Sequence, residues 1–264
     1  MSRRTRPSSP DPTSLLDRER QNWEELADLD PLWAILSFRE RKFGRWDNDA
    51  FFAEGDRDVE RLVSRFQELG YPRQLGAVLD FGCGVGRLAP GFSSHFDRYC
   101  GVDLSAEMVK QATELHQHRG NCQFVTNEDA TLAQFADQSY DLVFSLRVLQ
   151  HITDRSVIHS YLENFVRLVR PGGLLIFQLP ERIPRAEKMI YDTRRRIYLA
   201  LDRLGVSERL MFRRLALHPM TMNFVRENVV AATLQGAGAS LLAVDAGKQG
   251  IAIRDRTYYA TRRT

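Results

Sequence analysis

The stretch Val78-Leu79-Asp80-Phe81-Gly82-Cys83-Gly84-Val85-Gly86-Arg87-Leu88 decides the fold of this chain. It opens on apolar residues, as at the end of a buried strand, and three glycines then occupy alternate positions before a segment that can begin a helix. Glycine is needed where the backbone takes a positive φ or where a ligand approaches it closely. A loop that leads into a helix also presents free N–H groups and a partial positive charge. We therefore predict a strand, a ligand-binding turn and a helix.

Asp80 distinguishes this loop from the loop that binds the pyrophosphate of dinucleotides. The dinucleotide loop has the spacing G-x-G-x-x-G, whereas the third glycine here, Gly86, comes one residue earlier. A carboxylate beside a pyrophosphate would repel it, because like charges at close range destabilise each other. An acid next to a glycine-rich turn instead favours a ligand that carries positive charge.

The loop resembles motif I of the class I S-adenosylmethionine-dependent methyltransferases, and four further matches follow in the order of that family. They are Asp103, 21 positions after Gly82 at the end of a second apolar strand; Asp129-Ala130, after a third strand (Gln123–Val125); Ser139–Ser145, a fourth strand; and Leu168–Phe177, a helix end, turn and fifth strand. The resemblance implies an α/β fold with a Rossmann-like, doubly wound, seven-stranded sheet whose strand 7 is antiparallel. It also implies S-adenosyl-L-methionine as the cofactor.

The resemblance also implies which residues hold that cofactor. Asp103 would accept hydrogen bonds from the ribose hydroxyls and Asp129 would hold the adenine edge, although Asn127 and Glu128 are equally well placed after the third strand. Trp46, in a loop ahead of motif I, is expected in the cover over the cofactor. The expected cofactor-binding residues are Trp46, Asp80, Gly82, Cys83, Gly84, Gly86, Arg87, Asp103, Leu104, Met108, Asp129, Ala130 and Ser145. We interpret Cys83 as a small loop residue and not as a nucleophile.

His151 is the candidate catalytic residue. It follows the fourth strand, at the edge where ligands bind in open parallel sheets. An imidazole titrates near neutral pH and can take the proton that a hydroxyl acceptor must lose. We expect no other histidine near the methyl group. The alternative is that His151 orients the following turn by hydrogen bonding, or only lines the pocket.

The rest of the chain predicts additions around the sheet. Residues 1–13 indicate a disordered tail and 14–264 a single methyltransferase domain. Within it, 14–72 have helical spacing and form an N-terminal cap, and 181–218 form a helical insertion after strand five, where this fold commonly has its acceptor lid. We expect helices at 87–95, 105–118, 155–169 and 221–236, and strands at 240–244 and 257–261.

The amino-acid composition narrows the kinds of partner that the chain can bind. The chain has 264 residues and a formal charge of +3, which is too small to indicate nucleic-acid binding. Three cysteines without metal-ligand spacing predict no metal site, reduced thiols and a cytoplasmic location. No apolar run reaches the length of a bilayer span. Ten basic and five acidic residues lie from Glu181 to His218, so this insertion is predicted either to hold an anionic acceptor or to contact a membrane peripherally.

The leading hypothesis is methyl transfer to a small-molecule acceptor, anionic or saccharide, at a hydroxyl of a sugar or glycolipid precursor. The acceptor class rests on the sequences of Asp30–Ser37 and Leu149–Ile152 together with Asn127, which resemble a bacterial subgroup of class I methyltransferases encountered among glycan-modifying enzymes. Two alternatives stay open. One is an N-methyltransferase of a small metabolite, and the other is a non-catalytic module of the same fold that binds the cofactor or a protein.

Overall fold

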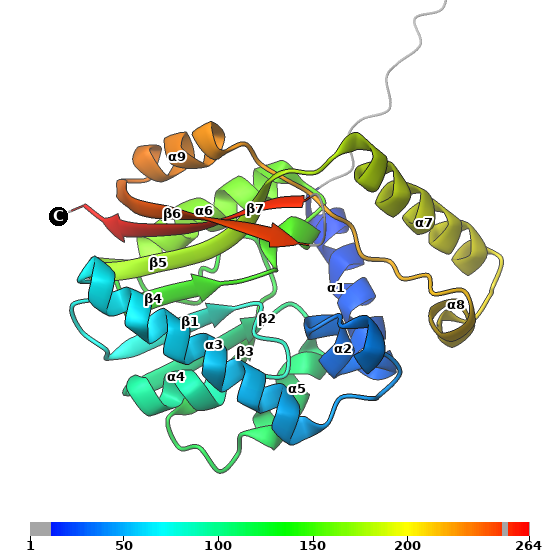
Figure 1. The fold of residues 1–264 in the computed structure, drawn as a ribbon, viewed down its shortest axis with the longest axis horizontal. Coiled ribbons are helices and arrows are strands. Elements are labelled where there is room, and N and C mark those ends of the chain that lie inside the picture. Colours follow the sequence, from blue (N-terminus) through cyan, green and yellow to red (C-terminus); the bar gives the residue numbers. More distant parts are fainter. Residues whose placement is uncertain (1–11, 250–252, 264) are drawn as a thin grey trace, which may run out of the picture.

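Seven strands form one sheet in the order β3-β2-β1-β4-β5-β7-β6 (Figure 1). The computed structural model describes residues 12–249 and 253–263, so nearly all of the tail predicted at residues 1–13 lies outside the described residues. The strands are β1 (Ala77–Phe81), β2 (Arg98–Asp103), β3 (Cys122–Thr126), β4 (Tyr140–Ser145), β5 (Val169–Arg182), β6 (Ala239–Gln249) and β7 (Ile253–Arg262). Strands β1 to β5 pair in parallel, and β7 runs antiparallel to β5 and β6. The predicted fold class is confirmed.

Each central strand is apolar on both sides because helices cover both faces of the sheet. All five residues of β1 are buried. Val78 packs with α3 (Asn48–Leu69) and α4 (Ala89–His95), whereas its neighbour Leu79 belongs to the core around α6 (Arg155–Leu168) and α9 (Glu227–Gly236). Successive strand residues point to opposite faces, so a continuous apolar run is what a parallel sheet requires.

The remaining helices are α1 (Pro12–Leu29), α2 (Pro31–Ile35), the 3₁₀ turn η1 (Arg39–Arg41), α5 (Ala106–Leu115), the 3₁₀ turn η2 (Leu149–His151), α7 (Arg185–Arg203) and α8 (Glu208–Arg214). Of these, α5 packs against β2 and β3, and α7 and α8 lie beyond the sheet (Figure 1). The N-terminal helical layer and the helical insertion after strand five are therefore present, as the sequence predicts. Helix α3 is capped by Asp47, whose side chain accepts a hydrogen bond from the Ala50 amide, and is followed by Gly70 in the left-handed region.

One predicted helix is too long. We expected a helix over 221–236, but α9 begins at Glu227 and residues 215–226 form an irregular segment, which we call the strap. The strap is tied to two distant parts of the chain: the Asn223 amide donates to the Gln150 carbonyl, and the Val225 amide donates to the Pro180 carbonyl. These tertiary bonds satisfy backbone groups that a helix would have used.

Candidate functional site

A cavity of about 880 Å³ opens at the carboxyl ends of β1, β2 and β4. The chain leaves β1 for β2 on one side and reaches β4 on the other, so this is the topological switch point where open α/β sheets bind ligands. The cavity volume lies in the range of about 300–1,000 Å³ that is usual for small-molecule sites. Helices α1, α2, α3 and α7 and the strap complete its walls. Among the described residues, no group of three or more His, Cys, Asp or Glu side chains is arranged to hold a metal ion.

The glycine loop after β1 forms the floor of this cavity. Gly82 has φ +79°, and a Cβ there would lie 2.2 Å from a methyl carbon of Val148. Gly84 has φ +53°, and a Cβ there would lie 2.4 Å from Ile35 of α2. The two glycines thus allow the strand-four loop and α2 to close on the turn, a role that only a residue without a side chain can fill.

Asp80 lies under this floor, and only 3% of it is exposed. The Tyr99 hydroxyl donates to Asp80 Oδ2 at 2.7 Å. Burial raises the pKa of Asp80 from an ordinary 3.8 to about 6, although the Tyr99 hydrogen bond and the nearby Arg87 charge act to lower it. The carboxylate is therefore ionised at neutral pH but poorly solvated, which is the state that a cationic ligand group stabilises.

Asp103 and Glu24 organise the neighbouring strand end. The Gly84 amide donates to Asp103 Oδ2 at 2.8 Å, and the Ser105 amide donates to Oδ1 at 3.0 Å, so Asp103 is fixed between the glycine loop and the start of α5. Burial raises the pKa of Asp103, and these amide bonds oppose the rise. Glu24 of α1 accepts from the Ser105 hydroxyl and from the amides of Ala106 and Glu107, the first amides of α5. The N-terminal helix thus caps α5 beside the cavity.

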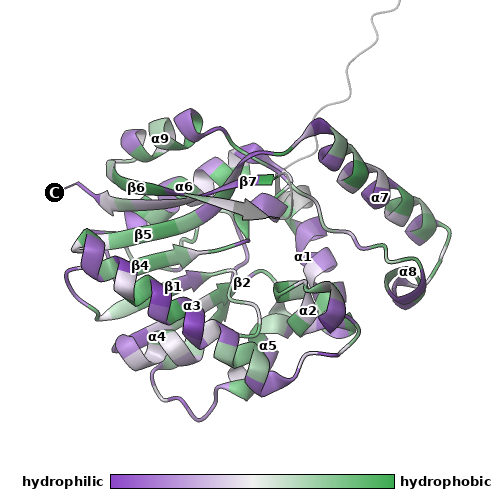
Figure 2. Cartoon of the chain, viewed as in Figure 1, coloured by the Kyte–Doolittle hydropathy of each residue, from purple (hydrophilic) through white to green (hydrophobic). Residues whose placement is uncertain are grey.

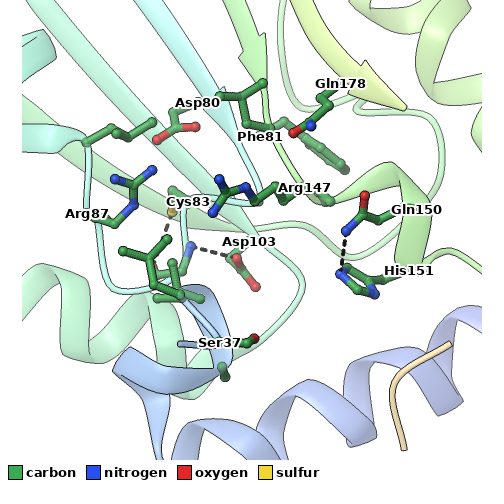
Figure 3. A pocket seen from close by; sticks show the side chains of 18 of the residues that line it. Ser37, Asp80, Phe81, Cys83, Arg87, Asp103, Arg147, Gln150, His151 and Gln178 are labelled. Carbon is green, nitrogen blue, oxygen red and sulfur yellow. Dashed lines mark hydrogen bonds between the residues drawn. The ribbon is translucent and has the colours of Figure 1, made fainter. Parts of the chain in front are cut away.

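Two arginines enter the same end of the cavity (Figure 3). Arg87 is paired with Asp58 at 2.8 Å. Arg147 follows β4 with φ +61°, an unfavourable conformation for a residue with a side chain. Burial lowers the pKa of Arg147, as does the charge of Arg87 to a smaller extent, while the charges of Asp58 and Asp255 oppose this. Strained residues of this kind cluster at ligand sites, and a guanidinium near Asp80 supplies the opposite charge that a zwitterionic ligand needs.

His151 lines the cavity at the end of η2, a short distance along the chain from Arg147. Its Nδ1 lies 2.8 Å from the Thr221 carbonyl oxygen, which can only accept, so Nδ1 carries the proton. Nε2 is then the basic nitrogen, and the Gln150 side-chain amide lies 3.2 Å from it (Figure 3). Burial lowers the pKa of His151 below its ordinary value of 6.5, so the ring is neutral at pH 7.

The structure adds residues to the cavity that the sequence did not predict. His218 of the strap also lines it, which corrects the expectation that His151 is the only histidine nearby. Burial, followed by the charges of Arg194 and Lys42, lowers the pKa of His218 to about 4. Buried polar atoms without a hydrogen-bond partner are rare and call for an explanation; two of them in this wall are His218 Nδ1 and Trp33 Nε1. Lys42 lies over the Trp33 ring, 4.5 Å from its centroid.

Eight of the thirteen predicted cofactor residues line the cavity: Asp80, Gly82, Cys83, Gly84, Arg87, Asp103, Leu104 and Met108. Burial raises the pKa of Cys83 well above its ordinary value, so its thiol stays protonated, as expected of a loop residue.

Five predicted residues lie outside the lining of this cavity. Trp46 is buried among Phe38 and Phe51, and its Nε1 donates to the Leu36 carbonyl, so it is a core residue of the N-terminal layer.

The other four are placed by packing or by local hydrogen bonds. A Cβ on Gly86 would meet His116 and Phe124, outside the cavity. The exposed Asp129 carboxylate accepts from the amides of Thr131 and Leu132. Ala130 packs on the core around α6, and Ser145 is fully buried at the end of β4.

Comparison with known proteins points to methyltransferases. Residues 79–177 match the protein family described as a methyltransferase domain. The chain is 33% identical over 100 residues to 2-methyl-6-phytyl-1,4-hydroquinone methyltransferase of Synechocystis, a match that spans 38% of this chain and 30% of the relative. It is 30% identical over 163 residues to ubiquinone biosynthesis O-methyltransferase of Paracidovorax citrulli, with 61% of this chain and 66% of the relative covered. In both cases the chain spans less than two thirds of the relative's length.

The fold has relatives among solved structures as well. Magnesium protoporphyrin IX methyltransferase from Synechocystis, crystallised with bound SAH, superposes with a TM-score of 0.60 at 20% identity. The match covers 96% of this chain and all of that one, which extends the fold likeness to the N-terminal helices and the insertion. The family match, the curated relatives and the strand order all support a class I S-adenosylmethionine-dependent methyltransferase.

Proposed function

We propose that this chain transfers a methyl group from S-adenosylmethionine to a hydroxyl of a small-molecule acceptor. The observation that carries the proposal is one continuous cavity that contains the acidic glycine-loop site at one end and the basic nitrogen of His151 at the other. A cofactor site alone would serve a binding module equally well. A neutral imidazole in the same space adds the group that an oxygen acceptor needs.

The cofactor fits the residues present. Asp80 offers a poorly solvated carboxylate to an ammonium group, and Arg147 offers a guanidinium to the adjoining carboxylate, so the two complement the amino-acid arm. Asp103 lies one strand further, where its carboxylate can accept from ribose hydroxyls. Leu104 and Met108 supply an apolar wall for a purine ring. When bound, S-adenosylmethionine supplies a methyl group already activated by its positively charged sulfur.

The acceptor end of the cavity combines aromatic and polar groups. Trp23 and Trp33 come from the N-terminal helices, Tyr191 comes from α7, and His218 comes from the strap. These contributions support the proposal that the insertion and the strap cover the acceptor. Aromatic faces beside hydrogen-bonding groups suit an acceptor with an apolar body and hydroxyl groups, such as a sugar attached to a lipid. The name of the Paracidovorax relative, an O-methyltransferase, favours oxygen as the methylated atom.

In this mechanism the protein orients the acceptor and removes its proton. The Thr221 carbonyl keeps the proton of the imidazole on Nδ1, so Nε2 of His151 is the nitrogen that takes the hydroxyl proton once the acceptor displaces the Gln150 side-chain amide from it. The lowered pKa of His151 keeps it unprotonated at neutral pH. His218 is the weaker candidate because a pKa of about 4 makes it a poor base.

The test compares His151→Asn with His159→Asn, a matched change on α6 where the imidazole bonds to Thr233 outside the cavity. Turnover is measured with a panel of hydroxyl acceptors, and cofactor affinity is measured separately by calorimetry. We expect His151→Asn to lower turnover by about 10²–10⁴-fold with cofactor affinity unchanged, and His159→Asn to leave both unchanged. Near-normal turnover of His151→Asn would remove the base role, and product from no acceptor despite tight cofactor binding would favour a binding module.

A further inference from the structure

Helix α7 presents an apolar stripe to solvent. Met189, Ile190, Ile197 and Leu204 are 65%, 54%, 46% and 79% exposed, unusually high fractions for large apolar side chains. The last three are spaced by seven residues, which is two helical turns, so they form one line along the helix. In Figure 2, α7 carries hydrophobic and hydrophilic bands although it lies at the periphery of the molecule.

The side of α7 next to this stripe, one residue further round the helix, is already occupied. The Tyr198 hydroxyl donates to Glu25 of α1 at 2.6 Å, and Tyr191, one heptad earlier, lines the cavity. These contacts fix the rotation of α7 about its axis. The apolar stripe therefore faces solvent in the packed helix and does not belong to the core. No part of the chain that the structure describes covers this stripe.

A line of arginines borders the stripe. Arg185, Arg196 and Arg203 are exposed, and their spacings of eleven and seven residues are three and two helical turns, so they too share one side of α7. None of the three forms an ion pair with the part of the chain that the structure describes. Two acids of the insertion are committed elsewhere: Glu181 pairs with Arg256 and Asp192 with Lys188.

Helix α8 continues both features. Leu210 and Leu215 are 48% and 50% exposed on and just after α8, and Arg209, Arg213 and Arg214 are exposed beside them. An apolar stripe with a border of basic residues is the pattern of helices that lie in the interface of an anionic bilayer. A second copy of the chain would instead bring the same surplus of positive charge against itself.

We propose that the outer face of α7, continued by α8, docks on the surface of an anionic lipid bilayer. The stripe enters the boundary between headgroups and acyl chains, and the arginines contact the lipid phosphates. Because Tyr191 on the inner side of the same helix lines the cavity, docking brings the site next to the bilayer. Among the described helices, none is long and apolar enough to cross a membrane, so the contact lies along the surface. This surface stands independently of the proposed methyl transfer.

The test is co-sedimentation of the full chain with vesicles of phosphatidylcholine mixed with phosphatidylglycerol, and with vesicles of phosphatidylcholine alone. We expect binding to the anionic vesicles, weakened by high salt, and little binding to the neutral ones. The double variant Arg196→Gln/Arg203→Gln is expected to lower the partition coefficient about 25-fold. Ile190→Glu/Ile197→Glu is expected to lower it at least about ten-fold.

The matched control is Leu75→Glu/Val229→Glu, which places two acids on apolar side chains that are 40% and 37% exposed elsewhere on the molecule. It should bind as the wild type does, and all variants should keep the wild-type circular dichroism spectrum and thermal midpoint. Failure of the wild type to sediment with anionic vesicles would overturn the proposal. The proposal would also be overturned if both α7 variants bound the anionic vesicles as strongly as the wild type does. A third contrary result would be a wild-type dimer that binds no lipid and that Ile190→Glu/Ile197→Glu converts to a monomer.

Discussion

Replacement of Asp80 by asparagine is expected to stabilise the free protein while it weakens cofactor binding. The pKa of Asp80 rises from an ordinary 3.8 to about 6 in the folded chain because the carboxyl is buried. Each pH unit of such a difference corresponds to about 1.4 kcal/mol, so the ionised carboxylate costs the folded state about 3 kcal/mol at pH 8. Asparagine carries no charge and still offers an oxygen to the Tyr99 hydroxyl, which now donates to Asp80 at 2.7 Å.

The sign of the pH dependence follows from the direction of this pKa change. The folded pKa lies above the unfolded one, so the wild-type protein loses stability as the pH rises from about 4 to about 6 and carries the full cost above that range. Asp80→Asn removes the loss of stability that is caused by ionisation of this carboxyl group. The gain in unfolding free energy should therefore approach about 3 kcal/mol at pH 8 and vanish near pH 4.

Binding should change in the opposite direction. A charge-assisted hydrogen bond contributes about 1.5–3 kcal/mol, so Asp80→Asn should weaken the affinity for S-adenosylhomocysteine about 10- to 100-fold. Wild-type affinity should also fall as the pH drops through about 6, by up to ten-fold per pH unit, because protonation removes the charge that faces the ligand's ammonium group.

The measurements are urea unfolding at pH 4.5 and pH 8, and calorimetric titration with S-adenosylhomocysteine at the same two values. Asp80→Ala serves as the comparison, since it removes the charge but leaves the buried Tyr99 hydroxyl unpaired and should stabilise less. A variant Asp80→Asn that is less stable than wild type at pH 8, or that binds the ligand as tightly, would refute the electrostatic reasoning.

Three further changes test the walls of the site. Gly55→Ala should destabilise the chain by about 2–3 kcal/mol, because a Cβ on this α3 residue would lie 2.1 Å from the backbone oxygen of Arg87 in the glycine loop. The control Gly236→Ala should raise the thermal midpoint slightly, because a Cβ there would have no atom within 4 Å. Glu24→Ala should cost about 1–2 kcal/mol by exposing the first amides of α5, whereas urea unfolding of the exposed-pair variant Glu54→Ala should shift by less than about 0.5 kcal/mol. Arg147→Gly should stabilise the chain by about 1 kcal/mol, since glycine accepts its φ of +61° without strain. Arg147→Ala keeps the strain, so equal stability of the two variants would contradict this account.

The sheet and its acidic edge could be predicted because they depend on local sequence. Strands buried on both faces read as continuous apolar runs, and glycines with positive φ mark the turn that follows β1. Asp80 and Asp103 end neighbouring parallel strands, so their side chains must meet at one edge of the sheet.

The cover of the site could not be predicted in the same way. His218 and Trp33 reach the cavity from the strap and from α2, whose positions depend on tertiary contacts and not on strand order. Trp46 carries the same apolar and polar character as a pocket residue, and only its packing against Phe51 assigns it to the core. The direction of the Asp129 side chain could not be predicted, because sequence spacing fixes the loop alone; the carboxylate accepts from the amides of Thr131 and Leu132.

The bond between His151 and the Thr221 carbonyl has a consequence for which nitrogen of the imidazole is basic. The carbonyl belongs to the strap, 70 residues away along the chain, and the strap also forms part of the wall around the acceptor. The strap is itself anchored next to His151, because the Asn223 side chain donates to the carbonyls of Ile152 and Thr153. The tautomer of the imidazole is therefore set by the tertiary position of the strap, and a change that displaced residues 215–226 would leave the Nδ1 proton without its acceptor.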